Sequence, residues 1–275
     1  MYPFSYVRPA SVAEAVDLLT RFPEASPLSG GMTLIPTLKQ RLGAPSHLVD
    51  LSRLPELQGI ARQGEVVRIG AATRHAQVAQ SELVRRCIPG LADLAGLIGD
   101  QQVRNRGTIG GSVANSDPAA DYPAAVLALD ATVVTDRRRI AADEFFTGMF
   151  ETALAPAEII VAFEFPLPRR SAYLKHRHTA SGYAVVGVFI ADHPGGPRVA
   201  ITGAGPRAFR WTAAESALAA QERSAWRAEL LAGMQPDATG LNEDASASRA
   251  YRAHLCGTLA RRALAGLRAG EHQAN

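Results

Sequence analysis

Residues 104–121 read RNRGTIGGSVANSDPAAD, and this stretch says more about the fold than any other part of the chain. A shorter stretch at residues 28–36, LSGGMTLIP, contains the same kind of glycine pair. Glycine adopts positive φ without a steric penalty and lets backbone N–H groups turn together toward an anion. Because hydroxyl side chains stand beside both pairs, we expect the two loops together to hold one diphosphate.

The shorter loop is expected to contribute the backbone N–H groups of residues 29–33. The residues that follow, TLIPTLKQRLG at 33–43, predict a helix that ends at Gly43 as its C-cap, and its positive end would face the same anion. In the longer loop, amides and hydroxyls are available from Thr108 to Ser112. Asp121 is placed to accept hydrogen bonds from sugar or ribityl hydroxyls.

Other common sites are disfavoured by the absence of their patterns. The chain has no G-x-x-x-x-G-K-[ST] sequence, and no G-x-G-x-x-G sequence follows a predicted strand, which argues against kinase-like and Rossmann-type sites. Ser29 and Ser112 lack the G-x-S-x-G context of a hydrolase nucleophile. His176 and His178 share a strand face but have no third ligand at suitable spacing, so the sequence predicts no metal site.

Three segments, two of which contain the glycine loops, carry a resemblance to a known family: SGGMTLIP at 29–36, IGDQQVRNRGTIGGSVANSDPAADYPAA at 98–125 and YLKHRHTASGYAVVGV at 173–188. They resemble the FAD-binding medium subunits of molybdenum hydroxylases, the family that includes carbon monoxide dehydrogenase and xanthine dehydrogenase. The resemblance covers nearly the whole chain. It implies an α+β protein with the two-lobed FAD-binding fold of the vanillyl-alcohol-oxidase (PCMH) type.

Apolar periodicity and turn residues suggest how the chain is divided. We expect lobe 1 of the FAD-binding fold at residues 1–55, lobe 2 at 56–170 and a C-terminal flavin-subunit domain at 171–275. That last domain is predicted to hold a three-stranded antiparallel sheet, from 171–180, 183–192 and 197–205, followed by helices at 211–221, 224–234 and 247–267. The longer glycine loop is expected at a helix-to-strand junction.

The resemblance also implies roles for residues near the flavin. Lys175 matches a lysine that contacts FAD, Tyr183 a tyrosine that packs against the isoalloxazine ring, and Ile160 an apolar contact of the same kind. Plainer interpretations stay open, with Ile160 as strand core and Lys175 as a solvated strand residue. The loops and the resemblance together predict as cofactor-binding residues Leu28, Ser29, Gly30, Gly31, Met32, Thr33, Leu34, Ile98, Thr108, Ile109, Gly110, Gly111, Ser112, Asp121, Ile160, Lys175 and Tyr183.

The implied function is that of an oxidoreductase subunit, which passes electrons from iron–sulfur clusters through FAD to an external acceptor. With only Cys87 and Cys256, the chain lacks the four thiolates that such a cluster typically needs. The resemblance places the molybdenum cofactor on a large partner subunit and the 2Fe-2S clusters on a small one, and implies a dimer of heterotrimers. No residue here is expected to be catalytic. A self-sufficient flavin oxidoreductase of the same fold and a non-redox nucleotide-binding assembly module remain alternatives.

Composition agrees with such a subunit without identifying it. The 275 residues are 47% hydrophobic, and a net charge of +3 is spread over mixed acidic and basic residues, which gives little support to nucleic-acid binding. The N-terminus shows no signal pattern, and no apolar run approaches the roughly 20 residues that cross a bilayer, so we expect a cytoplasmic protein. The run of arginines at 137–139 is expected to be a solvated hairpin, with partner docking as the second interpretation.

Overall fold

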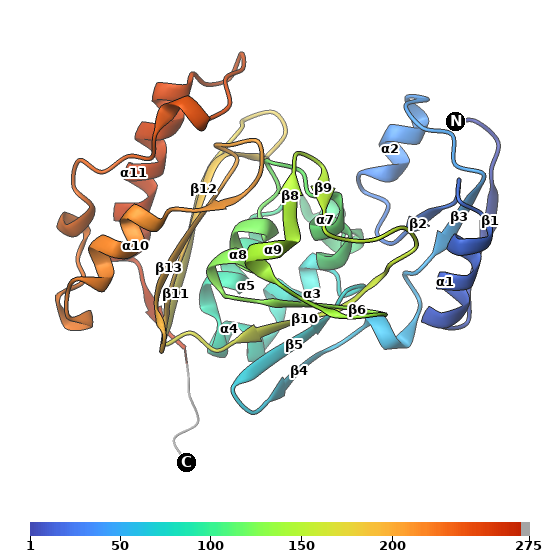
Figure 1. Cartoon of the computed structure of the whole chain (residues 1–275), viewed down its shortest axis with the longest axis horizontal. Helices are drawn as coiled ribbons and strands as arrows, with labels where there is room; N and C mark the ends of the chain where they lie inside the picture. The colour runs from blue at the N-terminus through green and yellow to red at the C-terminus, as the bar shows by residue number, and fades with distance from the viewer. Residues whose placement is uncertain (271–275) are drawn as a thin grey trace.

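The first lobe, on the right in Figure 1, is a small parallel sheet with a helix beside it. The computed structural model describes residues 1–270 of the chain. Ser11 caps the helix by accepting a hydrogen bond from the N–H of Glu14, and the helix buries Ala15 and Leu19 in a core shared with Val49. The strands pair in the order β1-β3-β2, and the elements are β1 (Ser5–Val7), α1 (Val12–Arg21), β2 (Ser26–Leu28), α2 (Leu34–Lys39), β3 (His47–Asp50) and the 3₁₀ turn η1 (Pro55–Leu57).

The second lobe is an antiparallel five-stranded sheet that carries a group of short helices (Figure 1). Its strands pair in the order β4-β5-β10-β6-β7, so β10 lies in the middle and buries Phe163 and Phe165 completely. The strands are β4 (Ile60–Gln63), β5 (Val66–Gly70), β6 (Thr132–Thr135), β7 (Arg139–Ala141) and β10 (Ile160–Pro166), with the small hairpin β8 (Phe146–Gly148) and β9 (Glu151–Thr152) outside the sheet. The helices are α3 (His75–Gln80), α4 (Glu82–Cys87), α5 (Pro89–Gly96), α6 (Gln101–Arg106), α7 (Ile109–Asn115), α8 (Tyr122–Ala128) and α9 (Ala142–Phe145).

The C-terminal lobe is a second antiparallel sheet with helices against both faces. Helices α5 and α8 of the second lobe pack against one face, and α11 and α10 cover the other, on the left in Figure 1. Every residue of the central strand β12 is buried as a result. The strand order is β14-β13-β12-β11-β15, and the elements are β11 (Arg170–Arg177), β12 (Ala184–His193), β13 (Gly196–Thr202), β14 (Phe209–Arg210), α10 (Thr212–Ala219), η2 (Arg223–Ala225), η3 (Ala228–Leu231), η4 (Ala238–Gly240), α11 (Arg249–Ala265) and β15 (Arg268–Ala269).

The predicted three strands of this lobe are confirmed as β11, β12 and β13, but the sheet has five strands. Strands β14 and β15 have two residues each, too few for an alternating pattern to reveal them. The sheets fall within residues 5–50, 60–166 and 170–269, and we propose to keep 1–55, 56–170 and 171–275 as the division of the chain. Residues 271–275 of that last range lie outside the described part.

Three local predictions were wrong. Residues 224–234 form the 3₁₀ turns η2 and η3 instead of an α-helix. Helix α2 ends at Lys39, not at Gly43, because Arg41 already adopts a left-handed φ of 61°. The longer glycine loop lies between two helices, α6 and α7, and not at a helix-to-strand junction, so its glycine pair falls in the first turn of α7.

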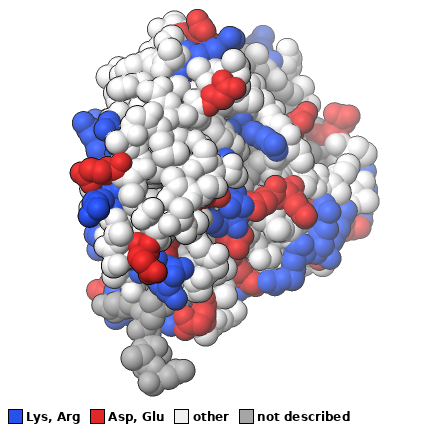
Figure 2. Space-filling view, turned by 60° about the vertical axis from the view of Figure 1, so that its left-hand side comes forward, with Lys and Arg blue, Asp and Glu red and all other residues white. Residues whose placement is uncertain are grey.

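The surface carries charges of both signs. Figure 2 shows Lys and Arg interleaved with Asp and Glu over the face it presents. The three arginines of the predicted hairpin each pair with a carboxylate, Arg137 with Asp136, Arg138 with Glu158 and Arg139 with Glu164. Within residues 1–270, no helix is both long enough and apolar enough to cross a membrane.

Candidate functional site

A cavity of about 530 Å³ is lined by residues of all three lobes. This volume falls in the range that is usual for cofactor pockets. All of the predicted cofactor-binding residues line it except Ile109 and Lys175. The fold therefore brings together, around one space, loops that lie far apart in the chain.

The two glycine loops touch each other at the edge of this cavity. The hydroxyl oxygens of Ser29 and Thr108 are 2.9 Å apart, which is a hydrogen bond. A Cβ atom on Gly30 would lie only 2.3 Å from the carbonyl oxygen of Arg106 and 2.6 Å from the Cα of Gly107. Only glycine allows this approach, because real Cβ atoms do not come within 3.0 Å of such neighbours.

The shorter loop keeps its amides available. Among residues 1–270, no acceptor takes the N–H groups of Gly30, Gly31 or Met32. Gly31 has φ +72°, a left-handed conformation that favours glycine. Exposed amides on a loop that turns in this way are what an anion-binding concavity requires.

The backbone amides of the longer loop were expected to be available to an anion, but they are bonded within the protein. Its backbone is hydrogen-bonded to the segment after β5. The N–H of Gly110 donates to the carbonyl oxygen of Ala71 at 2.8 Å, and the N–H of Ile109 donates to the carbonyl oxygen of Thr73 at 3.1 Å. The amides of Gly111 and Ser112 donate to Thr108, at its hydroxyl and its carbonyl oxygen. These N–H groups are therefore engaged inside the protein, and what this loop presents to the cavity is its surface and the hydroxyl of Ser112.

Lys175 lies behind the cavity wall in a buried cluster. Its side chain is 1% exposed, and its ammonium group donates to Asp121 Oδ2 at 3.0 Å and to the carbonyl oxygens of Leu97 and Gly182 at 2.9 and 3.0 Å. The interpretation of Lys175 as a solvated strand residue is therefore wrong. Asp121 also accepts a hydrogen bond from the hydroxyl of Tyr173, so both of its oxygens have protein partners.

The charges of this cluster depend on one another. Burial raises the pKa of the Asp121 carboxyl, and the nearby ammonium of Lys175 opposes that rise. Burial also raises the pKa of the Tyr173 hydroxyl well above its ordinary value, with the Asp121 charge adding to the effect. The ammonium of Lys175 thus links the Asp121 carboxylate to the backbone carbonyls of Leu97 and Gly182.

The remaining predicted residues occupy the walls. Tyr183 and Ile98 line the cavity near Gly182, and burial, followed by the charge of Asp117, raises the pKa of the Tyr183 hydroxyl. Ile160 is both cavity wall and core of the second lobe, so the strand-core interpretation is confirmed, and its contact with the flavin stays a prediction. Ile109 is fully buried in the same core, away from the cavity.

His75 and Glu158 are among the cavity residues that the sequence analysis missed. His75 begins helix α3 and is 4% exposed, and burial lowers its pKa to about 4, with a further contribution from Arg104. Its Nδ1 has no hydrogen-bond partner among the described residues. Glu158 lines the cavity from the loop before β10. Nothing in the local pattern around either residue separates it from an ordinary helix start or a surface loop.

Comparison with known proteins identifies the family to which this architecture belongs. Residues 2–168 match the model of the FAD binding domain in molybdopterin dehydrogenase, which is more than half of the chain. The medium chain of carbon monoxide dehydrogenase from Hydrogenophaga pseudoflava is 35% identical over 95% of this chain and 96% of its own. This chain belongs to the FAD-binding medium subunits of molybdenum hydroxylases.

Other members of the medium-subunit family agree. The glyceraldehyde dehydrogenase medium chain of Sulfolobus acidocaldarius is 38% identical over 70% of this chain and 71% of its own. Among solved structures, carbon monoxide dehydrogenase from Hydrogenophaga pseudoflava superposes with a TM-score of 0.85 at 36% identity, covering 96% of this chain and 97% of its own. Quinoline 2-oxidoreductase from Pseudomonas putida 86 gives 0.84 at 30% identity, covering 96% of both chains. The expected α+β FAD-binding fold is therefore confirmed.

Proposed function

We propose that the cavity described above is the FAD site and that the diphosphate lies between the two glycine loops. The observation that carries this proposal is the contact of the loops, where Gly30 leaves no room for a side chain and the N–H groups of Gly30, Gly31 and Met32 remain without acceptors. The volume and the mixed polar and apolar lining fit a dinucleotide. The residues present therefore suit the cofactor of the family.

Two groups of lining residues differ in character, and the difference supports one orientation. Tyr183 and Ile98 offer an aromatic ring and an apolar side chain beside the buried Lys175 cluster, which suits the isoalloxazine ring. Leu51, Leu57 and Ile159 form an apolar wall that belongs to the core around α1 and β3, and we place the adenosine half there.

The chain's own residues bind and orient the cofactor. FAD, when bound, supplies the redox chemistry, since a flavin accepts and releases electrons. The ammonium of Lys175 places a fixed positive charge next to the loop of Gly182, where charge influences the stability of a reduced flavin. Asp121 holds that ammonium in place, so we assign it a positioning role.

The assembly forms the second part of the proposal. A large subunit would carry the molybdenum cofactor and a small one the 2Fe-2S clusters, in a dimer of heterotrimers in the cytoplasm. Electrons would reach this chain from the small subunit and leave to an external acceptor. Family membership favours this over a self-sufficient oxidoreductase or a non-redox module.

Purification of the native complex tests the proposal directly. We expect an absorbance spectrum of oxidised flavin, FAD as the released cofactor on this chain, and molybdenum and iron only on copurifying chains. FAD on an active chain without partners would support the self-sufficient oxidoreductase instead. A complex without flavin would contradict the assignment of the cavity.

A further inference from the structure

One wall of the cavity is a loop without regular secondary structure, at residues 153–159 between β9 and β10. Leu154, Glu158 and Ile159 of this loop line the cavity. Its shape is not set by a helix or a strand, and Ala157 adopts a left-handed φ of 58°, which is unfavourable for a residue other than glycine. Contacts from elsewhere must therefore hold this wall in place.

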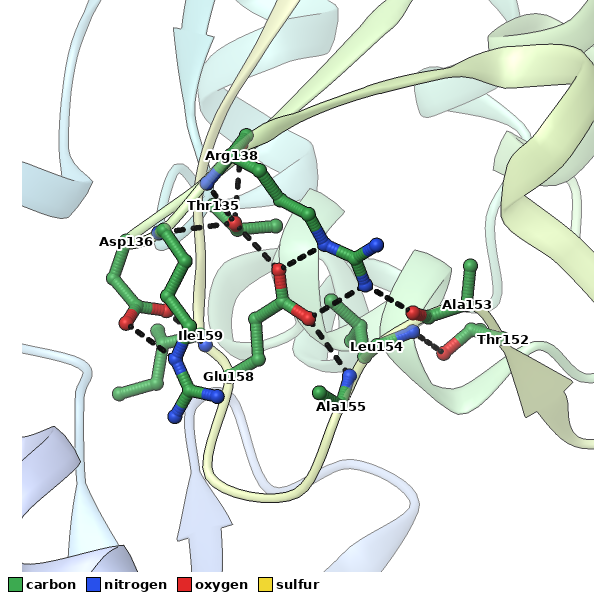
Figure 3. Close-up of polar contacts among 10 residues, drawn as sticks. Thr135, Asp136, Arg138, Thr152, Ala153, Leu154, Ala155, Glu158 and Ile159 are labelled. Carbon is green, nitrogen blue, oxygen red and sulfur yellow. Dashed lines mark hydrogen bonds and ion pairs between the residues drawn. The ribbon is translucent and has the colours of Figure 1, made fainter.

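Those contacts converge on the carboxylate of Glu158 (Figure 3). The side chain is completely buried, and its oxygens accept hydrogen bonds from the Thr135 hydroxyl at 2.7 Å, from the N–H of Ala155 at 2.7 Å and from two nitrogens of Arg138 at 2.9 Å each. The guanidinium of Arg138 lowers the pKa of the Glu158 carboxyl to about 2. With these partners, Glu158 acts as an internal fastening rather than as an acceptor for ligand hydroxyls.

Arg138 fastens the loop at both ends. Besides its paired hydrogen bonds to Glu158, its Nη2 donates to the carbonyl oxygen of Ala153 at 2.6 Å. Beside it on the hairpin between β6 and β7, Asp136 exchanges hydrogen bonds with the backbone of Ile159, at 2.7 and 3.0 Å. Figure 3 shows these side chains reaching from the hairpin across to the loop. The hairpin therefore supports the cavity wall through these hydrogen bonds.

We propose that Arg138 is a positioning residue for the adenosine half of FAD and thereby sets the preference of this chain for the dinucleotide over FMN. The inference rests on the FAD placement proposed above. Leu154 and Ile159 lie in the loop that Arg138 holds, and Ile159 shares its core with the apolar wall assigned to adenosine. FMN has no adenosine, so its binding does not depend on this wall. A residue that acts only through the wall must change the affinity for FAD and leave the affinity for FMN alone.

The test compares the dissociation constants of FAD and FMN for the full-length chain stripped of flavin, measured by quenching of flavin fluorescence. For Arg138→Gln we expect the constant for FAD to rise about tenfold and that for FMN to stay within about twofold of wild type. Arg138→Lys keeps the charge but not the two-pronged geometry, so it should fall in between. The matched control is Arg139→Gln, because Arg139 lies on the same hairpin, pairs with Glu164 of β10, and neither residue lines the cavity.

Two results would overturn the role of Arg138. One is a folded Arg138→Gln chain with wild-type affinity for FAD, and the other is an equal loss of FAD and FMN affinity, which indicates general damage. If Arg138→Gln does not fold, the same comparison is made with Arg138→Lys. The placement of FAD in this cavity is tested separately with Gly30→Val. If the placement is wrong, this variant will bind FAD as tightly as wild type does.

Discussion

The hydroxyl groups of Ser29 and Thr108 form a hydrogen bond of 2.9 Å between residues 79 positions apart in the sequence. Ser29 follows strand β2 of the first lobe's parallel sheet, and Thr108 caps helix α7 of the second lobe by accepting a hydrogen bond from the N–H of Gly111. One hydroxyl thus serves both the helix cap and the contact between the lobes. The two loops between which we place the diphosphate are thus joined by a direct hydrogen bond between the lobes.

Removing these two hydroxyls should lower the free energy of unfolding by different amounts. Ser29→Ala removes only the bond between the lobes, worth about 1 kcal/mol of unfolding free energy. Thr108→Ala also removes the cap of α7, which costs about 1 kcal/mol more. Urea unfolding of the two variants and the double variant measures the coupling. Equal costs for both single variants would contradict the double role of Thr108.

Space at the glycines gives a graded prediction for cofactor retention. Gly30→Val should abolish FAD retention, because even its Cβ would overlap the carbonyl of Arg106. At Gly111 a Cβ would lie 3.0 Å from the Thr108 hydroxyl, so Gly111→Ala should retain FAD whereas Gly111→Phe should fill the cavity and lose it. Flavin content per chain is read from the absorbance spectrum. Gly195→Ala is the control, since a Cβ there meets nothing within 4 Å.

Removing the charge of Lys175 should destabilise the protein strongly. Lys175→Met leaves the Asp121 carboxylate buried with only the Tyr173 hydroxyl, and breaking a buried pair in this way costs about 3–5 kcal/mol. Adding Asp121→Asn should recover part of that loss. The measurement is urea unfolding, and the control is Lys39→Met at the exposed other lysine of the chain. A Lys175→Met chain as stable as wild type would contradict a stabilising role for the buried Lys175–Asp121 ion pair.

His75 should make stability depend on pH. Its pKa is about 4 in the folded chain, where burial disfavours the charged form, against an ordinary value of 6.5. Between pH 6.5 and 4 the unfolded chain therefore binds more protons, so the contribution of His75 is complete above pH 6.5 and is lost as the pH falls through this window. His75→Asn should flatten that slope, whereas substitution of the exposed His254 should not. Unfolding midpoints from pH 7.5 to 4.5 provide the comparison.

Much of the architecture was accessible from the sequence because its signals are local. The glycine pairs, the alternation in 171–205 and the periodicity of 247–267 each depend on residues close together in the chain, and the structure has strands and a helix there. The same is true of the cavity lining around residues 28–34 and 108–112. A glycine that another backbone segment approaches closely can be recognised in the sequence, even when the sequence does not show which segment approaches it.

Contacts over long distances account for the rest. Lys175 could be assigned to the flavin by resemblance, but its burial depends on Leu97, Asp121 and Gly182, which only the folded chain brings together. The engagement of the longer loop's amides depends in the same way on the segment after β5. At 224–234 the apolar spacing predicted an α-helix, yet the packing of this segment against α10 and α11 is achieved by the short 3₁₀ turn η3.

The burial of β12 on both faces has a consequence for whether the two parts of the chain can fold independently. The match to the family model ends at residue 168, which suggests a detachable module. Yet Tyr173 and Phe189, beyond that end, belong to the same hydrophobic core as Phe163 and Phe165. A truncation after residue 168 would strip α5 and α8 of their covering sheet. The parts of the chain on either side of residue 168 therefore share one hydrophobic core, and we expect them to unfold as one cooperative unit.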